Sequence, residues 1–256
     1  MNSAGRKRLD QHLVDRGHYA SRSRAADAIR RGCVKVGGQT ATRAAAPVSP
    51  GDRIEIEDLA GGYVSRAALK LKAGLEATGY SPGGRTALDI GASTGGFTQV
   101  LLEVGAERVI AIDVGHGQLA PEIANDARVT RLEGVNARDL TPAMLGDAPI
   151  GFVVADVSFI SLKLALPPAL ALAETGAFGI FLVKPQFEVG REHVGKGGIV
   201  RDAKLGEEVA RDVAGWIGAQ PGWRLTRFLP SPVTGGDGNR EYIAAAIKDE
   251  AACARP

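Results

Sequence analysis

The 256-residue sequence has few cysteines, few aromatic residues and no long uninterrupted apolar run. Its two cysteines, Cys33 and Cys253, are too few for a disulfide framework or a cysteine metal cluster. The four histidines share no metal-ligand spacing, so we expect no bound metal. The amino terminus lacks the apolar stretch of a signal peptide, and charged residues and prolines interrupt the most apolar region, 162–183. We therefore expect a cytoplasmic protein that does not enter a membrane.

Positive charge is concentrated at the start of the chain. Residues 1–48 carry ten Lys and Arg against three Asp, a net charge of +7, whereas the remainder carries −5. A basic head on an acidic body favours an acidic partner, above all nucleic acid. A solvated basic face without a partner is the alternative.

Residues 6–59 have the pattern of a small α+β unit. Leu9, Leu13 and Val14 form a helical apolar stripe, and Ser21 begins a second helix. Two alternating segments, 32–38 and 52–57, predict short strands next to glycine and proline turns. The head is therefore expected to fold separately from the rest.

From Tyr63 onward, strand and helix patterns alternate, which predicts a doubly wound, mostly parallel Rossmann-like α/β sheet. The last two strands are close in sequence and predict an antiparallel edge hairpin. The expected strands are 86–90, 108–112, 129–133, 150–156, 178–183, 224–229 and 241–247, and the expected helices are 64–78, 96–104, 118–124, 160–173 and 204–218. The expected organisation is a small basic domain at 1–59, a linker at 60–64, an α/β domain at 65–248 and a tail at 249–256.

A glycine-rich turn at 88–97 joins the first strand of this sheet to its next helix. Small side chains let a ligand approach the backbone, and the helix amides face that ligand. Asp113 closes the next strand, where an acid can accept both hydroxyls of a ribose. The turn departs from the G-x-G-x-x-G pattern of nicotinamide enzymes, and a purely structural turn is the alternative.

Lys184 closes the apolar run 178–183, and Asp156 closes the strand before it. Parallel strands end at one sheet edge, where ligands bind, so the two side chains can meet. A partly desolvated lysine there can lose its proton and act as a base. A strand-end lysine that points into solvent is the alternative. Lys70 lies on the helix before the sheet and Glu241 lies at the final hairpin, where a solvated ion pair is the other interpretation.

Three stretches of the head, 8–14, 21–38 and 50–54, resemble the α-L RNA-binding module of the S-four ribosomal protein, also found in pseudouridine synthases. In that module the face formed by two helices binds structured RNA. The residues that would present this face here are Arg8, Arg22, Arg24, Arg30, Arg31 and Lys35.

The glycine turn, with Asp89 two residues before Gly91, resembles the first motif of S-adenosylmethionine-dependent methyltransferases. The resemblance implies S-adenosylmethionine as the cofactor, with the acid helping to place its methionine part. The implied cofactor-binding residues are Asp89, Gly91, Ser93, Gly95, Asp113, Val114, Asn136, Ala137 and Asp156.

Lys70, Asp156, Lys184 and Glu241 resemble the catalytic Lys-Asp-Lys-Glu tetrad of the cell-division-protein-J-like (FtsJ-like) RNA ribose 2′-O-methyltransferases. Through its motifs at 63–67, 89–98, 156–161 and 183–188, the whole chain is similar to the haemolysin-A (TlyA) family of rRNA cytidine-2′-O-methyltransferases. This resemblance implies methylation of a cytidine ribose in ribosomal RNA, with ribosomal subunits as the partner. It leaves open which nucleotide is modified, whether one or both subunits are substrates, and whether Lys184 removes the hydroxyl proton or only holds the hydroxyl.

Two segments beside the expected site allow more than one interpretation. Phe159 can stack on the cofactor adenine or on a flipped base, or it can pack in the core. The loop 186–198 is expected to be a mobile substrate loop whose Arg191 and Lys196 contact phosphates, with a plain flexible connection as the alternative. Arg66 is assigned to RNA binding as well.

Two other classes of protein compete with an enzyme. A ribosome-assembly factor without catalytic activity could use the same two folds to bind RNA. A membrane-active haemolysin is the other alternative, which the missing signal, span and amphipathic segment disfavour. We expect the chain to act as a monomer.

Overall fold

The computed structural model describes residues 5–146, 148–236 and 238–249. The chain divides into two compact units, residues 1–62 and 63–256. Each unit has hydrophobic core residues of its own. Within the described ranges, none of the helices is both long and apolar enough to cross a membrane.

The first unit packs two helices against short strands. Ser21 caps the second helix, because its Oγ accepts a hydrogen bond from the Arg24 amide. Leu9, Leu13 and Ile29 are fully buried between the elements, as their helical spacing predicts. The elements are β1 (Lys7–Arg8), α1 (Leu9–Asp15), α2 (Arg22–Arg30), β2 (Val34–Val36), β3 (Gln39–Thr40), β4 (Pro47–Val48) and β5 (Ile54–Ile56). The sequence pattern missed β1, β3 and β4, each two residues long.

The second unit is built on a seven-stranded sheet of order β11-β12-β10-β9-β6-β7-β8. Neighbours from β10 to β8 are parallel, whereas β12 is antiparallel to both β10 and β11. The strands are β6 (Thr86–Ile90), β7 (Arg108–Asp113), β8 (Val129–Glu133), β9 (Ile150–Ala155), β10 (Ala173–Val183), β11 (Trp223–Pro230) and β12 (Tyr242–Lys248). The predicted α/β class and its antiparallel edge are confirmed.

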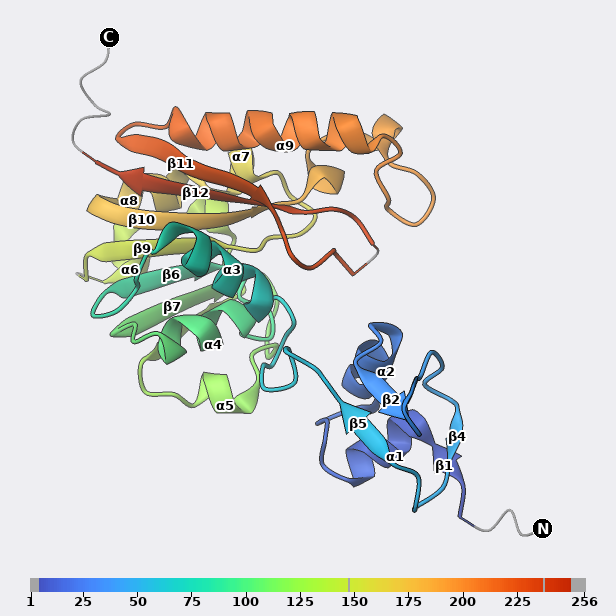
Figure 1. Ribbon diagram of the computed structural model, residues 1–256. Coiled ribbons are helices and arrows are strands. Elements are labelled where there is room, and N and C mark those ends of the chain that lie inside the picture. Colours follow the sequence, from blue (N-terminus) through green and yellow to red (C-terminus); the bar gives the residue numbers. More distant parts are fainter. Residues whose placement is uncertain (1–4, 147, 237, 250–256) are drawn as a thin grey trace. The chain divides into compact units, whose positions relative to one another are not determined.

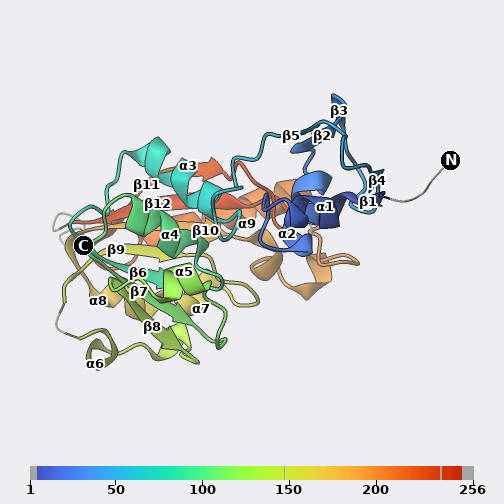
Figure 2. The ribbon, with the colours of Figure 1, turned by 90° about the horizontal axis from the view of Figure 1, so that it is seen from below.

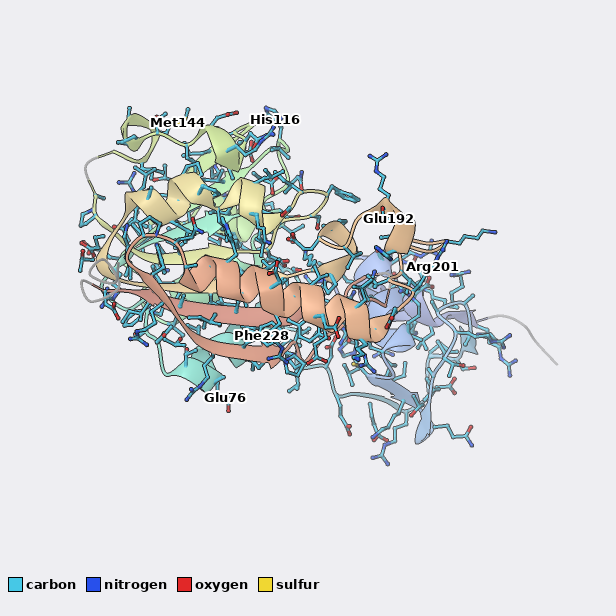
Figure 3. All side chains as sticks on the ribbon, turned by 90° about the horizontal axis from the view of Figure 1, so that it is seen from above. Glu76, His116, Met144, Glu192, Arg201 and Phe228 are labelled. Atoms are coloured by element: carbon cyan, nitrogen blue, oxygen red, sulfur yellow. The ribbon has the colours of Figure 1, made fainter. Side chains whose placement is uncertain are left out.

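Helices cover both faces of this sheet (Figures 1 and 2). On one face α3 and α4 pack over a cluster that includes Leu71 and Phe97, and on the other face α7, α8 and α9 pack over a second cluster. Arg211 of α9 lies over the ring of Phe228 on β11, which Figure 3 labels. The helices are α3 (Ala68–Thr78), α4 (Gly96–Glu103), α5 (Pro121–Ala124), α6 (Pro142–Leu145), α7 (Leu162–Ala165), α8 (Pro167–Leu172) and α9 (Ala203–Gly218), with 3₁₀ turns η1 (Ala137–Asp139), η2 (Pro185–Phe187) and η3 (Arg191–His193).

The expected helix 160–173 is wrong in extent, because the structure has α7 and α8 with a break at Leu166. Pro167 and Pro168 lack backbone N–H donors, so they begin a helix easily but cannot continue one. The strand that follows begins at Ala173 instead of 178, so β10 is correspondingly longer than expected.

Neighbouring strands bring the expected site residues to one edge of the sheet. Ala155 of β9 pairs with both Ile90 of β6 and Phe181 of β10. On the other side of β10, Val183 pairs with Tyr242 of β12. The residues just beyond these pairs are Gly91, Asp156, Lys184 and Glu241. This is the edge of a doubly wound sheet at which ligands bind.

Candidate active site

The glycine turn between β6 and α4 closely approaches two other segments. Gly91 has φ +81°, and a Cβ there would lie 3.0 Å from the carbonyl oxygen of Asp156. Gly95 has φ +96°, and a Cβ there would lie 3.0 Å from the side chains of Ile123 and Leu119. Glycine is required at both positions because a side chain would meet strain and neighbouring atoms together. The turn is also tied to β7, since the Ser93 amide donates to Asp113 Oδ2 at 2.8 Å.

A cavity of about 1280 Å³ opens beside this turn. Its lining combines the turn, the ends of β7 and β9, and the segment that follows β8. The predicted cofactor-binding residues that line it are Gly91, Ser93, Asp113, Val114, Asn136, Ala137 and Asp156. Two other predicted residues, Asp89 and Gly95, lie outside its lining.

Asp89 is fully buried at the end of β6, behind the turn. Its Oδ2 accepts a hydrogen bond from Thr98 Oγ1 at 2.6 Å, while its Oδ1 has no hydrogen-bond partner among the described residues. Burial raises the pKa of Asp89 to about 7, and the nearby carboxylates of Asp156 and Asp113 add to this rise. A buried carboxyl group with an unused oxygen is suited to a cationic ligand group.

A smaller cavity of about 160 Å³ adjoins the large one, because Gly91, Asp156 and Ser158 line both. Lys184 lines the small cavity, together with the start of α4. The glycine turn and the residue that follows β10 therefore line adjoining cavities and lie close to each other.

Two buried lysine–carboxylate pairs lie at this edge. Lys184 Nζ is 2.7 Å from Asp156 Oδ1 and also donates a hydrogen bond to Ser158 Oγ at 2.9 Å. Lys70 Nζ, from α3, is 2.5 Å from Glu241 Oε2. All four charged side chains are at least 88% buried, so the alternative of solvated ion pairs is wrong for both.

The loops that follow β9 and β10 are fastened together. Glu188 Oε2 accepts from Ser161 Oγ at 2.6 Å, and its Oε1 accepts from the Leu162 amide at 2.8 Å. Burial raises the pKa of Glu188. Phe159 lies between these contacts and Asp156, with φ +65° and 91% exposure, 5.1 Å from the ring of Phe187. The interpretation of Phe159 as a core residue is therefore wrong.

The loop predicted to contact substrate forms a small hairpin. Val194 and Val200 form an antiparallel bridge, and the Gly195 amide donates to the Ile199 carbonyl at 2.7 Å. Buried Asn239 holds this hairpin, because it accepts from the Val200 amide and donates to the Gly198 carbonyl. The exposed Arg191 lines the large cavity, while Lys196 lies on the turn of the hairpin. Figure 3 labels Glu192 of this loop and Arg201, which follows it.

In the first unit, several predicted RNA-binding side chains also form ion pairs. Arg8 and Arg22 both contact the buried Asp10, and Lys35 contacts Glu57. The side chains of Arg8 and Arg22 nevertheless remain about half exposed. They can therefore face an external phosphate while they hold Asp10.

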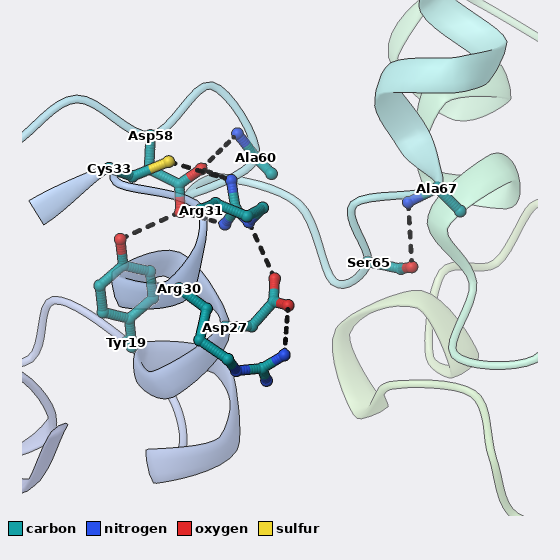
Figure 4. Close-up of polar contacts among 9 residues, drawn as sticks. All are labelled: Tyr19, Asp27, Arg30, Arg31, Cys33, Asp58, Ala60, Ser65 and Ala67. Carbon is teal, nitrogen blue, oxygen red and sulfur yellow. Dashed lines mark hydrogen bonds and ion pairs between the residues drawn. The ribbon is translucent and has the colours of Figure 1, made fainter. Parts of the chain in front are cut away.

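Arg31 differs from the other arginines because it holds a buried network (Figure 4). Its guanidinium donates to both oxygens of Asp58 at 2.8 Å, and Tyr19 donates to the same carboxylate. Burial alone would raise the pKa of Asp58, but these hydrogen bonds hold it below its usual value. Arg30, by contrast, is 65% exposed and lies 3.8 Å from Asp27.

Sequence reasoning missed several residues of the site. Gln118 accepts from Ser93 Oγ and lines the large cavity with Gln186. Ser158 and Glu188 fall within motifs that were recognised, but no spacing rule indicates which residue each would contact. Among the described residues, no group of three or more His, Cys, Asp and Glu could hold a metal ion.

The fold is typical of Rossmann-like methyltransferases: a mostly parallel sheet with an antiparallel edge, a glycine turn, and an acid at the end of the next strand. Two buried lysine–carboxylate pairs lie at the same edge. The model of the FtsJ-like methyltransferase family matches residues 63–248, and that of the S4 domain matches residues 7–54. The chain belongs to the FtsJ-like methyltransferase family and carries an amino-terminal S4 domain.

Several relatives are similar to this chain over nearly its whole length. The 16S/23S rRNA (cytidine-2′-O)-methyltransferase TlyA of Mycobacterium tuberculosis is 45% identical over 241 residues, covering 94% of this chain and 89% of the relative. Hemolysin A of Brachyspira hyodysenteriae is 41% identical, with 94% and 99% covered. A solved structure from Streptococcus thermophilus, whose name also contains the word hemolysin, has a TM-score of 0.74 at 35% identity, with 97% and 90% covered. The predicted family is confirmed.

Proposed function

We propose that this protein transfers a methyl group from S-adenosylmethionine to the 2′-hydroxyl of a cytidine ribose in ribosomal RNA. The observation that carries the proposal is the buried Lys184–Asp156 pair beside a cavity formed by the glycine turn. A ribose hydroxyl is a poor nucleophile, so this reaction needs a positioned group that accepts its proton. Cytidine and ribosomal RNA come from the name of the Mycobacterium tuberculosis relative.

The residues around the large cavity fit S-adenosylmethionine. Asp113 is placed to accept ribose hydroxyls, and Gly91 leaves the backbone open to a ligand. Asp89 Oδ1, which has no hydrogen-bond partner among the described residues, would accept a hydrogen bond from the ammonium group of the cofactor. When bound, the cofactor would supply a sulfonium methyl group, which an oxygen nucleophile can accept in line.

Lys184 would act at the substrate hydroxyl. As a free amine it takes the proton from the 2′-oxygen, and as an ammonium it donates a hydrogen bond that holds the hydroxyl. Asp156 fixes Nζ in both forms through its 2.7 Å contact. We favour proton removal by Lys184. Lys184 lines the small cavity, which adjoins the large cavity proposed for the cofactor.

Lys70 and Glu241 would support this group without touching the transferred proton. Their pair is more deeply buried than the Lys184 pair, and neither side chain lines the two cavities. The pair joins α3 to the start of β12, and β12 pairs with β10, so it helps to hold the end of β10, where Lys184 lies.

The basic side chains would bind the RNA substrate. In the first unit these are the side chains assigned to the RNA-binding face: Arg8, Arg22, Arg24, Arg30, Arg31 and Lys35. In the second unit they are Arg66, Arg191 and Lys196. Phosphate contacts of this kind give register and affinity, and the site then selects the nucleotide. Since ribosomal subunits would be the substrate, we expect the protein to act in the cytoplasm. We also expect it to act as a monomer.

The test is methyl transfer to purified ribosomal subunits. The protein is incubated with labelled S-adenosylmethionine and with separated small and large subunits, and the modified nucleotide is mapped by mass spectrometry. The proposal predicts a single added methyl group on a cytidine ribose in one or both subunits. Absence of transfer to either subunit and to free ribosomal RNA would contradict it and would favour an assembly factor without catalytic activity.

A further inference from the structure

The proposed base, Lys184, has a second polar contact whose role the Lys-Asp-Lys-Glu set leaves unexplained. Ser158 Oγ lies 2.9 Å from Lys184 Nζ and accepts a hydrogen bond from it. Ser158 lies two residues after Asp156, and both line the two adjoining cavities. One short segment therefore provides two oxygens to the same nitrogen.

The number of these contacts matters for the chemistry of an amine. A neutral lysine amine has two N–H bonds and one lone pair, arranged roughly as a tetrahedron around nitrogen. Ser158 accepts one hydrogen, and Asp156 Oδ1 at 2.7 Å is close enough to accept the other after a small rotation of the amine. The lone pair is then directed away from both oxygens. With one acceptor alone, the amine could rotate about its last carbon–nitrogen bond, and the lone pair would sample other directions. A second fixed acceptor therefore orients a base, which is a large part of its effectiveness.

The position of Ser158 is fixed by the surrounding loop. The next residue, Phe159, has φ +65°, which is unfavourable for a residue other than glycine. Glu188 then holds Ser161 and Leu162, and Glu188 lies on the same segment as Lys184. The two loops are thus joined both at the lysine and four residues later, so the donor and its acceptor are held together. Backbone strain of this kind persists where the surrounding structure imposes it.

We propose that Ser158 is a positioning residue that directs the lone pair of Lys184 toward the substrate hydroxyl. In the step, the hydroxyl O–H bond breaks and a new N–H bond forms at Nζ. The oxygen forms a bond to the methyl carbon as the S–CH₃ bond breaks, which would leave a neutral thioether. The resulting ammonium returns this proton to water after the product leaves. The inference rests on the proposed function, and it adds a neutral acceptor to the charged residues.

The test compares Ser158→Ala, Ser158→Thr and Ser81→Ala in single-turnover methyl transfer across a range of pH. Ser158→Ala is expected to lower the methyl-transfer rate about 10- to 100-fold, the usual effect of losing one hydrogen bond to a charged or reacting group. The plateau at high pH should fall as well, because the defect is in direction and is not repaired by removing protons. Ser158→Thr, which keeps the hydroxyl, should restore the rate to within about threefold of the wild type.

Three measurements separate this role from a structural one. The affinity for S-adenosylmethionine, the affinity for the RNA substrate and the unfolding midpoint of Ser158→Ala should match the wild type. Ser81→Ala is the matched control, because it removes a hydroxyl of the same unit that accepts from the Gly83 amide and lines neither cavity. It should leave the shape of the pH profile unchanged.

One readout does not depend on activity. In nitrogen-15 NMR spectra of the substrate-free protein, Ser158→Ala should shift the Nζ signal of Lys184, and Ser81→Ala should not. If Ser158→Ala transfers methyl groups within twofold of the wild type, or if the Nζ signal is unchanged, the inference is overturned. A wild-type protein that fails on every RNA substrate but shows the NMR shift would contradict the proposed function and leave the contact itself established; it would also remove the catalytic role given to Ser158.

Discussion

Lys70 and Lys184 are both buried at one edge of the same sheet, and each pairs with one carboxylate, yet their surroundings differ. Lys70 meets Glu241 in a pair whose side chains are 7% and 3% exposed, outside the lining of both cavities. Lys184 meets Asp156 and Ser158 and lines the small cavity. Similar ion pairs can therefore have different functions, and access to a cavity separates a supporting pair from a reacting one.

The largest expected effect on stability is at the enclosed pair. Glu241→Ala leaves the Lys70 ammonium buried without its partner, which should lower the free energy of unfolding by about 3–5 kcal/mol. Urea denaturation followed by tryptophan fluorescence measures this, because both tryptophans, Trp216 and Trp223, lie in the second unit.

A double variant sharpens this result. Replacing both partners by apolar residues, Lys70→Met with Glu241→Leu, removes the uncompensated charge and should recover most of the lost stability. If Glu241→Ala changes the unfolding free energy by less than about 1 kcal/mol, the Lys70–Glu241 pair does not stabilise the fold as proposed.

Asp89 is buried at this edge and has no lysine partner among the described residues. Its ionisation should therefore make the stability of the protein depend on pH. Its pKa is raised to about 7, mainly by burial, so the folded protein favours the protonated form. The stability from this group is then fully present below about pH 4 and is lost as the pH rises through about 7.

The wild type should therefore lose a few kcal/mol more than Asp89→Asn between pH 5 and pH 8, since each unit of pKa shift corresponds to about 1.4 kcal/mol. Denaturant titrations of both proteins at the two pH values test this expectation. Parallel stability changes in the two proteins would show that Asp89 is ionised throughout, against the effect of its burial.

The first unit offers a comparison on the same principle between two adjacent arginines. Arg31→Ala leaves Asp58 buried and should destabilise the first unit by about 1.5–3 kcal/mol, the cost of losing hydrogen bonds to a charged group. Arg30→Ala should instead leave stability within about 0.5 kcal/mol while weakening RNA binding. Its binding should also depend less steeply on salt, by about one unit of slope for a lost phosphate contact.

Hydrogen exchange of the amides in residues 5–62 measures the first effect, and RNA titrations at several salt concentrations measure the second. Equal loss of RNA affinity in both variants at full stability would make Arg31 a binding residue in its own right. Faster exchange in Arg30→Ala would show that both arginines are structural.

The smallest expected effect is at the carboxylate that joins the two active-site loops. Glu188→Gln keeps an acceptor for the Leu162 amide and can donate to Ser161, whose hydroxyl can turn to accept. It should change the methyl-transfer rate less than threefold, whereas Glu188→Ala should lower it more, because both contacts are lost. Similar losses in the two variants would show that the negative charge is needed, not the hydrogen-bond pattern.

The sequence was a good guide where chain position decides which residues meet. Asp156 and Lys184 each follow a buried strand, and parallel neighbouring strands end at one edge, so their pairing could be predicted. The double proline at 167–168 was visible in the sequence, but the apolar pattern on both sides obscured the break it causes. Unlike this helix break, the distances between neighbouring strand ends follow directly from the regular geometry of a pleated sheet.

The contacts that the sequence missed depend on loop conformation. Ser158 contacts Lys184 from a loop whose backbone turns to φ +65° at Phe159, and no residue preference predicts that conformation for a phenylalanine. Arg31 was assigned to RNA binding because it falls on the two-helix face of the module that the head resembles, whereas its partner Asp58 lies 27 residues away. Such pairs become visible only when the folded chain is known.

The most direct test of the account is to compare Lys184→Ala with the wild type in single-turnover methyl transfer, with S-adenosylmethionine affinity measured by calorimetry. Lys163→Ala is a matched control, because Lys163 forms a more exposed pair with Asp212. The account predicts that Lys184→Ala loses at least about a hundredfold in rate, the usual contribution of a general base, while the cofactor still binds. A rate above about one hundredth of the wild type would contradict the assignment of Lys184 as the base.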